Sequence, residues 1–137
     1  MILKAKAKDK EGNWVIGEPH LKTSLYPHIH TFEEVSRKVI IQEDTVRYFS
    51  NMYDEEGDEI YEGDIVQWKN DGKLYVVIFK HGMFYGSVEY CHLHIYGGFP
   101  LHALAENQDE FKCKIVGNIY DNKELIINPK YKSFEIN

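Results

Sequence analysis

The stretch "DEIYEGDIVQWKNDG", residues 58–72, decides the fold of this chain. Gly63 stands between two acidic residues, immediately before a predicted strand over residues 64–69, and we expect the backbone to bend sharply there. The Asn-Asp-Gly sequence at residues 70–72 is a strong hairpin signal between that strand and a second one over residues 73–80. The stretch therefore predicts two antiparallel strands joined by a tight turn.

A second bend precedes this stretch. Asp54, followed three residues later by Gly57, suits a type I turn in which the aspartate caps the backbone and the glycine takes a positive φ. The two bends together should direct Ile60 and Tyr61 into the interior. The run over residues 73–80 is apolar on both faces, which is typical of a central strand that is covered on two sides.

Upstream, residues 4–8 alternate lysine and alanine, so a strand would carry the lysines on one face and the alanines on the other. Polar turn residues at 9–13 lead into an apolar run at 14–16, and the three segments predict a hairpin. The lysine row also suits a nucleic-acid contact, although solvated strand faces commonly have this pattern. Residues 17–36 lack a dependable period and are predicted to be mostly loop, with a short strand at 28–32.

Further strands are predicted at 39–41, 46–49, 83–90, 92–97 and 112–120. A turn at His81-Gly82 precedes the third of these, residues 100–111 suit a loop or one helical turn, and Asn122 is placed to cap a last short turn. About eight or nine short strands with little helix predict a mainly β fold of antiparallel strands, with a small, strongly bent barrel between residues 60 and 120.

Composition narrows the class of protein. A chain of 137 residues with 43% hydrophobic and 14% aromatic residues is expected to form one ordered domain. Its formal charge of -6 disfavours a nucleic-acid partner, which would need a local basic patch. We expect no signal peptide and no membrane span, and Cys91 and Cys113, which form no CxxC, indicate a reducing cytoplasm.

Acidic residues crowd the segment that contains both bends: Asp54, Glu55, Glu56, Asp58, Glu59, Glu62 and Asp64. A calcium-binding EF-hand loop needs glycine at its sixth position and glutamate at its twelfth. With Gly63 at the sixth position, Lys69 occupies the twelfth, so the match fails. A solvated turn explains the acids better than an ion site does.

The chain has two H-x-H pairs, and each pair could present two imidazoles to one zinc or iron ion, because residues two apart on a strand share a face. The pairs are His28 with His30 and His92 with His94, and either His81 or His102 could supply a third ligand. Half-exposed strand histidines are also common without a metal. We therefore predict no metal ligand and no cofactor, and the pairs stay open candidates.

Nucleophilic catalysis has little support, because the chain has no G-x-S-x-G and Ser87 lacks the strand-to-helix context of a nucleophile elbow. No glycine-rich phosphate loop is present either. Aromatic residues interleave with lysines in one region, as on a surface that binds single strands: Trp68, Lys69, Lys73, Tyr75 and Lys80. Most aromatic residues of this kind belong to a core.

Two signatures resemble the YopX family of small proteins encoded by bacterial phages and prophages. They are "IYEGDIV" at 60–66, preceded by the turn at 54–57, and "VGNIYDNKEL" at 116–125. Two upstream segments, "KAKAKDKEGNWVIG" at 4–17 and "IIQEDTVRYF" at 40–49, are also similar to the family. The chain departs from the family pattern at Asn51, Met52 and Lys123.

The resemblance implies an N-terminal β region packed on a C-terminal SH3-like barrel, frequent oligomers and no established activity. We expect one unit over residues 1–125, with the N-terminal region at 1–53 and the barrel region at 54–125, followed by a tail at 126–137. No catalytic, cofactor-binding or metal-binding residue is assigned.

The expected function is that of a non-enzymatic protein in the cytoplasm of a bacterial host. It would bind its own copies or a host or phage protein, and no membrane is involved. A small barrel that binds single-stranded nucleic acid is the alternative, and a histidine-ligated metal enzyme is the second alternative.

Overall fold

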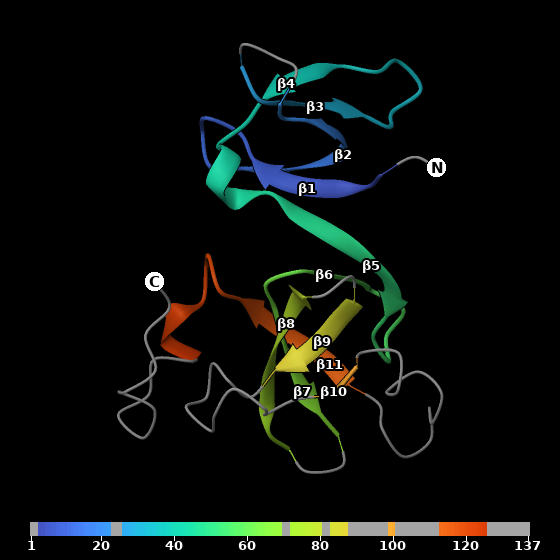
Figure 1. Cartoon of the computed structure of the whole chain (residues 1–137), viewed down its shortest axis with the longest axis vertical. Coiled ribbons are helices and arrows are strands. Elements are labelled where there is room, and N and C mark those ends of the chain that lie inside the picture. The colour runs from blue at the N-terminus through green and yellow to red at the C-terminus, as the bar shows by residue number, and fades with distance from the viewer. Residues whose placement is uncertain are drawn as a thin grey trace. The chain divides into compact units, whose positions relative to one another are not determined.

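The structure, a computed structural model, describes residues 3–22, 26–69, 72–80, 83–87, 99–100 and 113–125 (Figure 1). The chain divides into two compact units, Met1–Phe49 and Ser50–Asn137. Among the described residues, helix is confined to two short 3-10 turns, η1 (Glu43–Thr45) and η3 (Lys123–Leu125). No described helix has the length and apolar character needed to cross a membrane.

One six-stranded antiparallel sheet has the order β4-β3-β2-β1-β5-β6. Its strands are β1 (Ala5–Lys8), β2 (Trp14–His20), β3 (His28–Thr31), β4 (Lys38–Ile40), β5 (Arg47–Tyr53) and β6 (Glu59–Tyr61). The first four of these strands and the beginning of β5 belong to the N-terminal unit. The core of this unit contains Ala7, Ile29 and Ile41, with Val15 and Val46 packed against them.

The predicted first hairpin is confirmed, because β1 pairs with β2 and the alanines Ala5 and Ala7 are fully buried. The prediction of loop for residues 17–20 is wrong. These residues continue β2 and pair with β3, from Gly17 opposite Thr31 to His20 opposite His28. Pairing with β3, the next strand along the chain, gives this polar segment an extended conformation that its own sequence pattern does not indicate.

The second sheet, in the C-terminal unit, has the order β10-β9-β8-β7-β11. Its strands are β7 (Asp64–Trp68), β8 (Leu74–Lys80), β9 (Met83–Ser87), β10 (Phe99–Pro100) and β11 (Cys113–Asn118). All of its pairings are antiparallel, and β8 lies between β7 and β9 as predicted for a central strand. A cluster of Ile60, Val66, Tyr75, Val77 and Cys113 forms the larger core of this unit.

Both predicted bends are confirmed. Gly57 and Gly63 each have a φ of 86°, a conformation that suits glycine because it has no Cβ. Ile60 and Tyr61 lie between them and are each only 1% exposed. Gly63 also donates its N–H to the Val77 carbonyl, at 2.7 Å, so this bend is tied to the central strand.

The predicted mainly β, antiparallel fold is confirmed, but the described residues do not form a closed barrel. In that part of the chain the second sheet ends at β10 on one side and β11 on the other, and no pairing joins them. The strand expected at 92–97, the segment 101–111 and the tail at 126–137 lie outside the described residues.

The same turn is built twice, at residues 9–13 (DKEGN) and 54–58 (DEEGD). The Asp9 carboxylate accepts hydrogen bonds from the amides of residues 11 and 13, both at 2.9 Å. The Asp54 carboxylate accepts the equivalent bonds from residues 56 and 58, also at 2.9 Å. Its second oxygen accepts a further bond, at 3.1 Å, from the amide of Ile115 in β11.

This difference predicts unequal costs for removing the two aspartates. Asp54→Ala should lower the free energy of unfolding by about 3 kcal/mol, because three main-chain amides lose the buried carboxylate that accepts their hydrogen bonds. Asp9→Ala, the matched control in an exposed turn, should cost only about 1 kcal/mol. Urea unfolding followed by fluorescence of Trp14 and Trp68, one in each unit, measures both; equal losses would contradict the bond to β11.

Candidate functional site

In the acidic segment, the buried carboxylates accept hydrogen bonds from main-chain amides. Asp54 holds three amides, as described above, and Asp64 accepts the Tyr61 amide at 2.7 Å. The carboxylates of Asp54, Glu56 and Asp58 lie near one another, but Glu56 is also 3.4 Å from the Lys114 ammonium. This arrangement agrees with a structural turn, and nothing further points to a cation there.

Cys113 is a free cysteine in the part of the chain that the structure describes, and its surroundings make the thiol unreactive. It is buried, and burial, aided by the charges of Asp54 and Glu55, raises its pKa to about 11. The thiol is therefore protonated at neutral pH, and the thiolate is the reactive form. Cys91 lies outside the described residues, as does the side chain of Ser87.

Of the two aromatic residues proposed for single-strand binding, Tyr75 is buried and Trp68 is partly buried. Tyr75 is 5% exposed and belongs to the core, and the Trp68 ring packs on it edge to face at a centroid distance of 5.5 Å. A base needs an open ring face on which to stack. In the lysine row, the Lys8 ammonium lies 5.2 Å from the Trp14 ring centroid and Lys4 lies 5.0 Å from that of Phe49.

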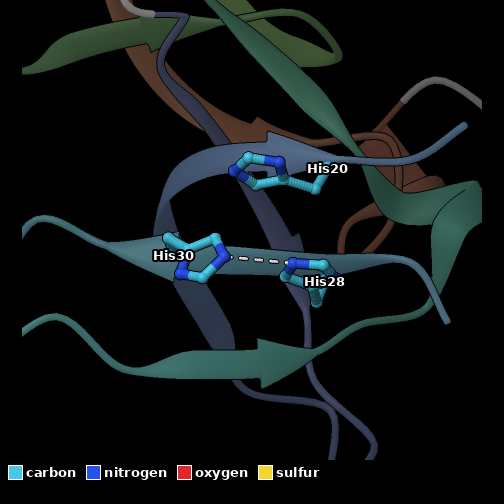
Figure 2. A group of neighbouring side chains, drawn as sticks. All are labelled: His20, His28 and His30. Carbon is cyan, nitrogen blue, oxygen red and sulfur yellow. Dashed lines mark hydrogen bonds between the residues drawn. The ribbon is translucent and has the colours of Figure 1, made fainter. Parts of the chain in front are cut away.

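Three histidines lie close together on one face of the six-stranded sheet (Figure 2). His28 and His30 share a face of β3 because they are two residues apart, as predicted. The register of β2 with β3 places His20 directly opposite His28 and Glu18 directly opposite His30. Their ligand nitrogens all lie within 4.8 Å of one another.

His20 is the member that the sequence prediction missed, because residues 17–20 were expected to be loop. Glu18 and His20 alternate with Gly17 and Pro19, and this alternation was the sequence signal for a strand. It is too short to predict a strand without the pairing that extends β2 to His20. The third ligands considered from the sequence, His81 and His102, lie outside the described residues, as do His92 and His94.

Hydrogen bonds orient the three rings. His28 Nδ1 is 3.0 Å from the Tyr26 carbonyl oxygen, which can only accept, so Nδ1 carries a proton and donates it. His28 Nε2 and His30 Nε2 are 3.1 Å apart, as the dashed line in Figure 2 shows. On the other strand, His20 Nε2 donates to the Glu18 carboxylate at 3.0 Å.

The rings are also packed against one another. His20 and His28 stack, with centroids 5.0 Å apart and planes 6° from parallel, and His30 lies edge-on to both. Desolvation lowers the pKa of His30, and the neighbouring His20, His28 and Lys38 lower it further. His30 is therefore neutral at pH 7 and keeps a lone pair on one ring nitrogen.

Gly17 permits this approach of the two strands. A Cβ at this position would collide with the carbonyl oxygen of His30 and lie 2.5 Å from Ile29 Cγ2. Backbone atoms cannot yield as a flexible side chain can. The glycine is required by the pairing of β2 with β3, on which the histidine cluster is built.

We expect Gly17→Ala to lower the free energy of unfolding by about 2–3 kcal/mol, because the added methyl group overpacks a buried strand pair. Gly12→Ala is the control. Gly12, unlike Gly17, has a positive φ, 88°, but a Cβ there meets nothing within 4 Å, so the backbone conformation alone should make the cost about 1 kcal/mol. Thermal or urea unfolding measures the difference; a cost at Gly17 no larger than that at Gly12 would contradict the close approach.

Alkylation tests the state of Cys113 in a Cys91→Ser protein. The pKa of about 11, against an ordinary value of 9.0, reduces the thiolate fraction at pH 8 by roughly 100-fold. Iodoacetamide should therefore modify the folded protein at least that much more slowly than the urea-unfolded chain, as followed by mass spectrometry. Equal rates would show that the thiol is accessible and ordinary.

Comparison with known proteins identifies one family. A family model described as YopX protein matches residues 6–127, which is nearly the whole chain. The match includes both signature segments and the two upstream segments that suggested the resemblance, apart from the first two residues of the lysine–alanine run. No curated protein matches the chain significantly.

Proposed function

We propose a non-enzymatic binding function for this protein, which belongs to the YopX family: it associates with further copies of itself, and through them or directly with a host or phage protein. Family membership supplies no specific activity, so the proposal depends on the residues. The family resemblance also supports an SH3-like barrel for the C-terminal unit. Cysteine usage supports a place in the cytoplasm of the bacterial host.

Several groups that commonly perform catalysis serve the main chain or are inactive here, and this is the first support for the proposal. The Asp54 carboxylate holds three amides, and the Ser50 hydroxyl donates to the Ile60 carbonyl at 2.7 Å. The Cys113 thiol has a raised pKa. A nucleophile needs an adjacent base or a lowered pKa, and these described groups have neither arrangement.

The observation that carries the proposal is the exposed apolar loop beside strand β4. Strand β4 is the last strand on its side of the six-stranded sheet among the described residues. The loop that leads into it exposes Phe32 by 49% and Val35 by 78%. Exposed apolar residues next to a sheet edge are typical of a surface that pairs with another chain.

Hydrogen bonding in β4 agrees with this role. Arg37 and Ile41 are bonded toward β3 and its flank, through the Thr31 amide at 2.9 Å and the Pro27 carbonyl at 3.1 Å. Antiparallel bonds alternate along a strand, so the main-chain groups of Lys38 point to the opposite side. Beyond the end of β4, Ile41 forms an isolated antiparallel bridge with Asp9, so the beginning of β4 is the part available for pairing. A second copy could add its own β4 beside Lys38, which buries Val35 against its counterpart and extends the sheet across a two-fold axis.

Self-association tests this proposal. Val35→Asp should weaken the dimer by about tenfold or more, because a charge replaces an apolar contact at the new interface. Ser36→Asp adds the same charge at the neighbouring exposed position and should change the dimer much less. Sedimentation equilibrium or light scattering over a concentration series gives the dissociation constants.

Two results would contradict this proposal. A wild-type protein that stays monomeric at all concentrations, and that retains no partner from infected cells, does not act by self-assembly. If both variants weaken the dimer equally, Val35 does not lie in the interface.

A further inference from the structure

We propose that His20, His28 and His30 form a binding site for one divalent transition-metal ion of the zinc type. The three imidazoles come from two adjacent strands and converge on one face of the sheet (Figure 2). Imidazole is a ligand that zinc, copper, nickel and iron accept, whereas magnesium and calcium prefer oxygen. The inference goes beyond the binding function proposed above.

The spacing of the ring nitrogens fits tetrahedral coordination. A zinc–nitrogen bond of about 2.0–2.1 Å at the tetrahedral angle places two donor atoms about 3.3–3.4 Å apart. His28 Nε2 and His30 Nε2 are 3.1 Å apart, and the ligand atoms of all three residues lie within 4.8 Å of one another. Small ring rotations would therefore bring the three nitrogens around one ion. On binding, the proton that His30 Nε2 donates to His28 Nε2 moves to His30 Nδ1, which frees the Nε2 lone pair for the ion.

The partners around the cluster match the outer contacts of a metal site. His28 donates Nδ1–H to the Tyr26 carbonyl, which leaves the Nε2 lone pair directed at His30. His20 donates Nε2–H to Glu18, a pairing of carboxylate and histidine that increases the basicity of the other nitrogen. Ligating histidines commonly have such a second hydrogen bond, which fixes the tautomer and the ring orientation.

A purely structural role explains the cluster less completely. A histidine pair needs only its mutual hydrogen bond, whereas here a third ring from the next strand stacks on the pair and is itself held by a carboxylate. His28 is 6% exposed, while His20 and His30 stay partly exposed, so an ion can enter from solvent. Three protein ligands leave a fourth position for water or for a donor from another molecule.

The experiment uses the full chain without a histidine tag. The protein is equilibrated with Zn²⁺, dialysed and analysed for bound zinc, and the affinity is measured by competition with a chromophoric chelator. We expect one ion per chain. A Co²⁺ titration should give the intense visible absorption of a tetrahedral site.

Two variants locate the site. His30→Asn removes a ligand and should weaken zinc binding by about 100-fold or more, and Glu18→Gln, which keeps all three imidazoles, should weaken it by about tenfold. The matched control is the double variant His92→Asn/His94→Asn, which removes the other H-x-H pair and should leave the affinity unchanged. Circular dichroism and thermal unfolding establish whether each variant is folded. If His30→Asn does not fold, the affinity of Glu18→Gln tests the proposal.

Either of two results overturns the proposal. One is a wild-type protein that retains no zinc or cobalt after dialysis. The other is binding that survives both Glu18→Gln and His30→Asn but is lost in the His92→Asn/His94→Asn control.

Discussion

The carboxylate of Asp54 is the constraint on which the C-terminal unit depends. One oxygen holds the turn at residues 54–58, and the other holds the amide of Ile115, 61 residues further along the chain. The next residue, Glu55, adds a main-chain bond to the Cys113 carbonyl at 2.9 Å. A short acidic turn thereby fixes the position of β11, and the core that contains Cys113 forms around it.

Gly63 supplies the second fixed point of this unit. Its N–H donates to Val77 in the central strand, and its carbonyl accepts the Ile119 amide at 2.9 Å, just beyond the end of β11. Gly63 makes both bonds in a conformation with positive φ, which suits glycine. The two bends therefore connect segments that are distant in the sequence, which explains why this stretch is rich in residues that serve the backbone.

The N-terminal unit uses its polar residues differently. Its first turn, around Asp9, is held by local bonds and by the Gln42 side chain, which donates to the Asp9 carbonyl at 2.7 Å. Its exposed features are an apolar loop beside β4 and a face that carries three imidazoles. The C-terminal unit directs its buried acids and its thiol to stability. Under the two proposals made above, the N-terminal unit is the one that presents groups able to bind a partner or an ion.

The sequence by itself determined what depends on neighbouring residues. Turns at Asp54-Gly57 and Gly63, the hairpin ahead of Gly72, the alternation in Ala5–Lys8 and the shared face of His28 and His30 all follow from local φ preferences and a two-residue period. The tertiary structure alone decided the pairing of distant segments. It extended β2 to His20, brought that residue opposite His28, required a glycine at position 17 where β3 passes, and gave Asp54 its bond to β11. The physical reason is that strand register depends on which partner strand is available, and no local preference of residues 17–20 encodes a partner that follows only after an intervening loop.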